Sequence, residues 1–197
     1  LYKVAAKGGK PQRLTAQNEH FELYPQFSRD GKKLVYVSWH DQQQGQIKVI
    51  DLTSNQVKTV VSAPGKYLEP SFSPDGNTLV FRKGGAGSLL DKRWSLNTGI
   101  YTVPAAGGEM KLVSRNGFAP HFAQRNDRIF AMDYGQSPAL LAIDLVTQTQ
   151  RTLYSAKYGT EFKVSPDGKY VAFADRFKVY VTPFAERGAV IDISGSD

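Results

Sequence analysis

The chain has 197 residues, of which 41% are hydrophobic and 22% charged, a composition typical of a folded globular protein. No segment approaches the run of about 18 to 20 apolar residues that a membrane-spanning helix needs. The absence of cysteine excludes disulfides and thiolate metal sites. The net charge of +7 is spread singly over the chain rather than in runs, so we expect no nucleic-acid partner.

The first elements that we expect are two strands within residues 1–15, separated by the turn at Gly8 and Gly9. Their apolar residues Leu1 and Val4 are three positions apart, a spacing that recurs along the chain. The chain starts on this strand without an initiator Met or a signal peptide. We therefore expect a segment of a longer protein, with any targeting signal outside it.

A repeated phrase decides the fold prediction. Residues 25–36 (PQFSRDGKKLVY) return 45 positions later as residues 70–81 (PSFSPDGNTLVF). A third copy occupies residues 162–173 (FKVSPDGKYVAF), and a degenerate copy occupies residues 120–130 (PHFAQRNDRIF). Such self-similarity at intervals of about 40 to 50 residues is typical of repeat architectures.

Each phrase has the chemistry of a β-hairpin turn. Asp30, Asp75 and Asp167 can bond to their own backbone, and the glycine that follows accepts a positive φ. We interpret these aspartates as turn residues rather than calcium ligands, because each belongs to its own repeat. Two further strands follow every hairpin, the last of them expected at 57–61, 110–114 and 189–193, and no segment favours a helix.

Units of four short antiparallel strands predict a β-propeller, in which sheets pack around a central channel. We predict an all-β fold, a propeller segment of about four four-stranded antiparallel blades plus a partial leading blade. A β-sandwich would not need the internal copying. The expected divisions are a partial blade at 1–24, full blades at 25–69, 70–119 and 120–161, and a last blade at 162–197.

The phrase at 70–81, followed by IYTVPAAGGE at 100–109, resembles the TolB-type propeller repeat over almost the whole chain. Three stretches resemble more closely the propeller that precedes the metal-dependent amidohydrolase barrel of certain exported bacterial enzymes. They are 81–104, with FRKGG, RW and GIYTVP, then DRF at 175–177 and VYVTPF at 179–184.

The resemblance implies a non-catalytic propeller segment of a larger periplasmic or exported hydrolase, serving as scaffold, gate or protein-interaction domain. Its partner would be an attached hydrolase domain or another protein. Two alternatives stay open: a free-standing periplasmic adaptor that binds another protein, and the gating propeller of a prolyl-oligopeptidase-like peptidase.

No catalytic or cofactor motif is evident. The three histidines, His20, His40 and His121, share no local spacing of the H-x-H or H-E-x-x-H kind, and there is no G-x-S-x-G elbow. The glycine-rich stretch 84–88 lacks the helix that a phosphate-binding loop requires. We expect no catalytic residue, cofactor or metal in this segment.

The connections between second and third strands and between blades should emerge on one common face, where propellers usually meet ligands. The longest connection spans 82–98, beyond what a hairpin needs. The alternative is that Arg82, Arg93 and Arg176 pair with Glu69, Glu161 and Asp175 to fasten neighbouring blades, while Trp94 packs the loop down. The candidate binding residues are Arg82, Lys83, Arg93, Trp94, His40, Glu69, His121, Glu161 and Arg176, and the same loops carry Trp39, Asp41, Tyr67, Tyr158 and Asp175.

Overall fold

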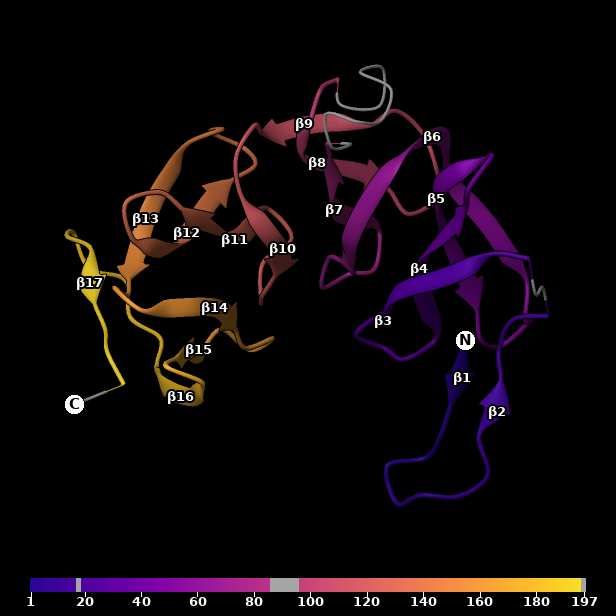
Figure 1. Ribbon diagram of the computed structural model, residues 1–197, viewed down its shortest axis with the longest axis horizontal. Helices are drawn as coiled ribbons and strands as arrows, with labels where there is room; N and C mark the ends of the chain where they lie inside the picture. The colour runs from indigo at the N-terminus through magenta and orange to yellow at the C-terminus, as the bar shows by residue number, and fades with distance from the viewer. Residues whose placement is uncertain (17–18, 86–95, 196–197) are drawn as a thin grey trace.

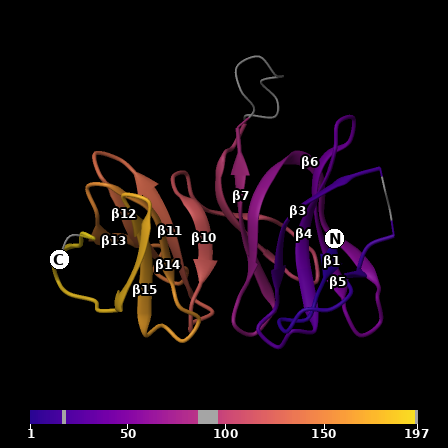
Figure 2. The ribbon, with the colours of Figure 1, turned by 60° about the horizontal axis from the view of Figure 1, so that its bottom comes forward.

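A computed structural model describes residues 1–16, 19–85 and 96–195. Within these ranges every regular element is a β-strand, and the strands form mainly antiparallel sheets that follow one another along an arc (Figure 1). The predicted all-β propeller architecture is confirmed. Figure 2 shows the strands running between two opposite ends of the molecule.

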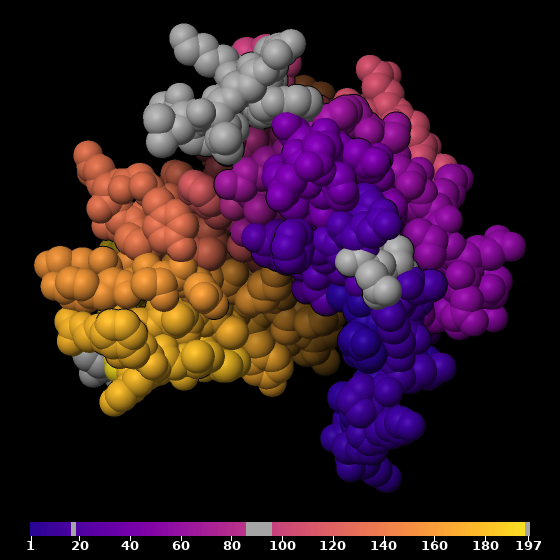
Figure 3. Space-filling model, turned by 45° about the vertical axis from the view of Figure 1, so that its right-hand side comes forward, coloured from indigo at the N-terminus to yellow at the C-terminus, as the bar shows by residue number. Residues whose placement is uncertain are grey.

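The two leading strands are present. β1 (Tyr2–Lys3) and β2 (Gln12–Arg13) pair antiparallel and form a hairpin that projects from the body of the molecule (Figure 3). Leu1 and Leu14, at the base of this hairpin, pack against the buried cluster of Leu34, Tyr36 and Ile50. The partial leading blade thus covers part of the outer side of the next sheet.

A continuous sheet of seven strands forms the first two full blades. It is continuous because β6 belongs to both blades and bends between them, near Gly65. Gly45 pairs with Gly65 so closely that a Cβ at Gly45 would lie 2.4 Å from the Gly65 carbonyl oxygen. The strands are β3 (Phe21–Phe27), β4 (Lys33–His40), β5 (Gln44–Asp51), β6 (Val57–Phe72), β7 (Thr78–Gly84), β8 (Gly99–Pro104) and β9 (Lys111–Ser114).

Two further blades complete the arc. The third blade consists of β10 (Phe118–Phe122), β11 (Arg128–Tyr134), β12 (Pro138–Asp144) and β13 (Gln150–Ser155). The fourth consists of β14 (Gly159–Val164), β15 (Tyr170–Asp175) and β16 (Lys178–Pro183).

The fourth strand expected for the last blade, at 189–193, takes a different place. Ile191 and Asp192 form β17, which pairs parallel with β13 of the preceding blade. Side chains just before it explain this course: Phe184 packs edge-on against Phe130 at 5.6 Å, and Glu186 forms ion pairs with Arg128 and Arg151. These contacts direct the chain to the outer edge of the third blade rather than back along β16.

The repeated turn has one conformation in its three clear copies. Ser28, Ser73 and Ser165 each donate a hydrogen bond of 2.6 Å to the aspartate two residues on. The glycine that follows each aspartate has a φ of 70° to 72°. The serine hydroxyl is the main cause that lowers the pKa of Asp30, Asp75 and Asp167. These aspartates serve as turn residues, as the sequence predicts.

Neighbouring blades pack face to face through apolar side chains. Val35, Phe72 and Phe81 belong to one buried cluster between the first two full blades, and Phe130 and Phe162 belong to another between the last two. This packing is the main source of stability, since burying one such side chain contributes about 1.5 to 3 kcal/mol.

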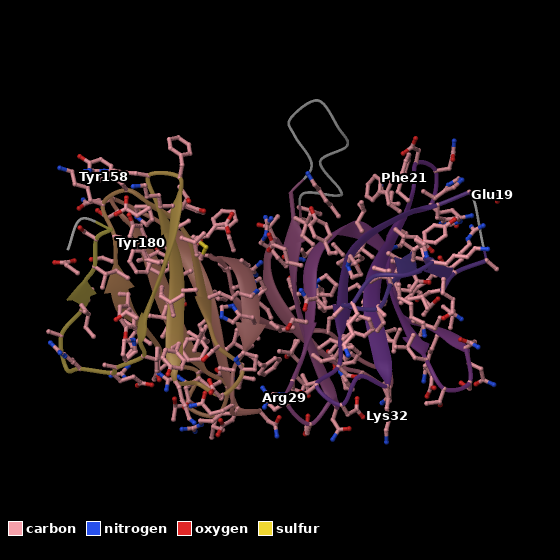
Figure 4. The ribbon with its side chains drawn as sticks, turned by 90° about the horizontal axis from the view of Figure 1, so that it is seen from below. Glu19, Phe21, Arg29, Lys32, Tyr158 and Tyr180 are labelled. Carbon is pink, nitrogen blue, oxygen red and sulfur yellow. The ribbon has the colours of Figure 1, made fainter. Side chains whose placement is uncertain are left out.

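The two ends of the molecule carry different connections. In Figure 4, Glu19, Phe21 and Tyr158 lie at one end, and Arg29 and Lys32 of the repeated turn lie at the other. We call the first end the loop face and the second the turn face. The loop face carries the connections between second and third strands and between blades, as the sequence predicts for one common face.

Candidate functional site

Arg82 and Glu69 form the best-defined contact of the candidate residues. Nε of Arg82 lies 3.2 Å from Oε2 of Glu69, and the guanidinium lies 4.8 Å from the centre of the Phe118 ring. The same Glu69 oxygen accepts a hydrogen bond of 2.8 Å from the backbone N–H of Ala119, in the next blade. This pair therefore fastens the second full blade to the third. Fastening neighbouring blades is the alternative to ligand binding that we considered for these residues from the sequence.

Arg176 makes a different contact from the one expected. Its guanidinium lies 4.5 Å from the centre of the Tyr158 ring, and the described residues provide it with no ion pair to Glu161 or Asp175. Arg93 and Trp94 lie outside the described residues. Lys83, near the end of β7, lies opposite Gly99 in the register of the antiparallel strands β7 and β8.

His40 lies at another corner of the loop face, at the end of β4. Its ring packs 4.9 Å from that of His20, and its Nδ1 accepts a hydrogen bond of 3.3 Å from the N–H of Gln42. Trp39 donates a hydrogen bond of 2.9 Å to Asp41. These residues form a local turn structure that shares no contact with the pair of Arg82 and Glu69.

The first strand of each blade contains a bulge that was not predicted from the sequence. Tyr24, Glu69 and Ala119 each precede the repeated proline, and their φ angles are 54°, 55° and 48°. Each lies at a register shift in the first strand of its blade, and β14 has the corresponding shift just before Glu161. A bulge of this kind redirects a side chain. The proline that follows in three of the four repeats, at Pro25, Pro70 and Pro120, was the only sign of the bulge in the sequence.

The bulges help to form a pocket of about 470 Å³, which we call the inter-blade pocket. Phe118 and Tyr134 form one wall, with their rings edge to face at 5.3 Å, and the Tyr134 hydroxyl donates to the carbonyl oxygen of Thr160. Glu69, Glu161 and Lys163 also line the pocket. It thus combines the exposed aromatic surface of the third blade with charged groups from the blades on either side of it.

Charged groups in this pocket act on one another. Desolvation lowers the pKa of Lys163, while the carboxylates of Glu69 and Glu161 act in the opposite direction. Desolvation raises the pKa of the Tyr134 phenol, and the same two carboxylates add to the effect. Within the described part of the chain, the side chains of Glu161 and Lys163 form neither a hydrogen bond nor an ion pair. Both are therefore available to a binding partner.

His121 is not part of an accessible binding face, contrary to the expectation. It is 3% exposed, and its Nε2 accepts a hydrogen bond of 3.0 Å from the N–H of Val164. Its Nδ1 lies 3.0 Å from the carbonyl oxygen of Ala119, so this nitrogen must carry the proton and donate it. Burial lowers the pKa of His121 to about 3. The histidine joins the third and fourth blades as a neutral side chain.

No group of three or more His, Cys, Asp and Glu side chains that could hold a metal ion occurs in ranges 1–16, 19–85 and 96–195. Among the residues that the structure describes, there is no helix long and apolar enough to cross a membrane. What the site offers chemically is recognition: aromatic walls, a free carboxylate and a free ammonium group.

The family model of the TolB beta propeller domain matches residues 1–182. The chain belongs to the TolB beta-propeller family. The Tol-Pal system protein TolB of Francisella tularensis subsp. holarctica (strain OSU18) is 27% identical over 158 residues, which cover 77% of this chain and 34% of that protein. The TolB of strain SCHU S4 of the same species is 26% identical over the same length. The chain thus spans about a third of the length of these relatives.

Solved structures share the fold. TolB from Acinetobacter baumannii aligns with a TM-score of 0.76 at 22% identity, over 92% of this chain and 45% of that one. An oligogalacturonate lyase in complex with manganese aligns with a TM-score of 0.69 at 14% identity, over 88% of this chain and 54% of that one. The TolB-like character that the repeats predict is confirmed.

Proposed function

We propose that this TolB-like segment is a non-catalytic part of a larger exported hydrolase and that its loop face binds the hydrolase domain. The observation that carries the proposal is the inter-blade pocket, where Phe118 and Tyr134 are partly exposed beside the unpaired charges of Glu161 and Lys163. Aromatic side chains next to charged groups are the usual anchors of protein interfaces. The fold by itself fixes no activity, so the proposal rests on the residues of the pocket.

Two likenesses support a hydrolase as the parent protein. The motifs at 81–104, 175–177 and 179–184 resemble the propeller of exported metal-dependent amidohydrolases. Longer hydrolytic enzymes contain this fold as one part: the tricorn protease aligns with a TM-score of 0.65 over 23% of its chain, and a prolyl endopeptidase with 0.63 over 30%. The resemblance to TolB favours a periplasmic or exported location, with which the absence of cysteine is compatible.

A second candidate is a free-standing adaptor that binds another envelope protein through the same face. The relatives named as Tol-Pal system proteins favour it. The gating propeller of a prolyl-oligopeptidase-like peptidase is a third candidate, favoured by the prolyl endopeptidase likeness.

The coding region on both sides of this segment distinguishes the three candidates. We expect a downstream H-x-H motif at the start of a metal-dependent barrel, because two imidazoles must converge on the catalytic metal. A G-x-S-x-G elbow would instead favour the peptidase. A stop codon directly after residue 197 would contradict a hydrolase parent and support the adaptor.

A further inference from the structure

Arg29 joins blades that are not neighbours. Its Nη2 donates a hydrogen bond of 2.6 Å to the carbonyl oxygen of Ala123, after β10, and one of 3.0 Å to that of Pro166, after β14. Arg29 itself belongs to the turn between β3 and β4 of the first full blade. In Figure 1 this turn and the turn between β14 and β15 point towards each other across the inner side of the arc, and Figure 4 shows Arg29 at the turn face. One side chain thus links the first full blade to the third and the fourth.

Other contacts on the turn face join neighbouring blades. The N–H of Asp75 donates a hydrogen bond of 3.1 Å to Oδ1 of Asn126, and the side chain of Gln124 occupies the space that a Cβ at Gly168 would take. Neighbouring blades also share buried apolar clusters, whereas the first full blade and the fourth share none among the described residues. Apart from Arg29, their separation therefore depends on the packing of the two blades between them.

The repeated turn does not itself require an arginine. Its three clear copies read Ser-Arg-Asp-Gly at 28–31 and Ser-Pro-Asp-Gly at 73–76 and 165–168, and they share one conformation. Proline suits this position because its ring fixes φ at the value that the turn needs. The contacts of the side chain, rather than the turn, thus explain why Arg29 stands where the other copies have proline.

The carbonyl of Ala123 receives from Arg29 the hydrogen bond that the other copies obtain within the turn. In the clear copies the carbonyl at the serine position accepts the glycine N–H, as that of Ser73 does from Gly76 at 2.9 Å. The degenerate copy has Ala123 at the serine position and Asn126 at the glycine position, and Arg29 is the donor there. Ala123 is fully buried, and a buried carbonyl without a donor is unfavourable. The third blade therefore depends on a side chain of the first.

We propose that Arg29 is a positioning residue that holds the turn-face ends of β10 and β14 and thereby fixes the shape of the inter-blade pocket. The opposite ends of these strands carry Phe118 and Glu161, which line that pocket. Both strands are short, so a displacement at the turn face also displaces the pocket walls at the loop face. The inference rests on the pocket as the proposed binding site, but it holds whatever binds there.

Distances between two spin labels test the link on the intact protein. This chain has no cysteine, and Ser54→Cys and Lys169→Cys place labels at exposed positions of the first full blade and the fourth. Arg29→Pro removes the guanidinium and keeps the turn, because two other copies have proline there. We expect the label distance to increase by about 3 Å, the length of the hydrogen bonds that water replaces.

Lys32→Gln is the matched control for the label distance. It removes the same charge from the same turn, but the Lys32 side chain is exposed and should leave the distance as in the wild type. The proposal is overturned if Arg29→Pro has the wild-type distance or if the control lengthens it equally.

Hydrogen exchange shows whether the effect reaches the strands that form the pocket. In Arg29→Pro we expect the amides of β10 and β14 to exchange about tenfold faster, because a hydrogen bond from a charged donor no longer opposes local opening. The amides of β5, in the same blade as Arg29, should exchange as in the wild type. If Arg29→Pro does not fold, Arg29→Gln serves instead, since its shorter, neutral side chain also loses the link.

Two results of the exchange measurement would contradict the positioning role. Unchanged exchange in β10 and β14 would confine Arg29 to its own turn, and equal acceleration in β5 would indicate a general loss of stability. Neither measurement involves a hydrolase domain, so such a failure is distinct from a failure of the proposed function.

Discussion

His121 shows how a single side chain can hold two blades together. Both of its ring nitrogens are used, Nε2 as an acceptor from Val164 and Nδ1 as a donor to Ala119. A protonated imidazole would present two donors, so it could not accept the Val164 N–H. The contact therefore requires the neutral form.

This requirement predicts acid sensitivity. The pKa of His121 is about 3 in the folded protein and 6.5 in its ordinary state. Between these values the unfolded chain binds a proton that the folded chain does not, so stability falls as the pH falls from 6.5 towards 3. The loss amounts to about 1.4 kcal/mol for each pH unit, or about 2 kcal/mol at pH 5.

Glutamine at this position provides the test. In His121→Gln the side-chain oxygen can accept the Val164 N–H at any pH, although the bond to Ala119 is lost. We expect a variant that is less stable at pH 7.5 but loses less of its stability between pH 7.5 and pH 5 than the wild type. Urea unfolding at both pH values measures this, and an equal loss in the two proteins would show that His121 does not cause the acid sensitivity.

At the level of the element, the repeated turn is stabilised by its serine. Ser73 is buried, donates to Asp75 and accepts a hydrogen bond of 2.9 Å from the N–H of Thr78. Ser73→Ala removes both bonds, and we expect a loss of about 1 to 2 kcal/mol in the free energy of unfolding, measured by urea unfolding. Ser54→Ala is the control, because Ser54 is exposed and accepts one bond of 3.4 Å. A loss no larger than that of the control would contradict a stabilising role of the turn.

The hairpins could be predicted from the sequence because their determinants are local: a Ser–Asp–Gly turn between two apolar strands. β17 could not, because its place depends on contacts of Phe184 and Glu186 with another blade. A repeat pattern predicts that equivalent segments behave alike, and it fails where one copy makes long-range contacts that the others lack.

At the scale of the whole molecule, the stacking of neighbouring blades creates the candidate site. The pairing of Arg82 with Glu69 was open to prediction, because opposite charges on neighbouring strands suggest it. The inter-blade pocket was not, because residues as distant in the sequence as Glu69, Phe118 and Glu161 meet only when the blades are stacked. The burial of His121 depends on the same stacking, which explains why its role was predicted wrongly.

The measurement that tests the central claim most directly is site-specific photo-crosslinking of the full-length protein in its native host. A photoreactive residue replaces Tyr134 on the wall of the inter-blade pocket or, as the control, Lys32 on the turn face. We predict that position 134, and not position 32, crosslinks to a hydrolase domain of the same polypeptide. Crosslinking of position 134 to a separate envelope protein, or equal crosslinking from both positions, would contradict a loop face that binds its own hydrolase domain.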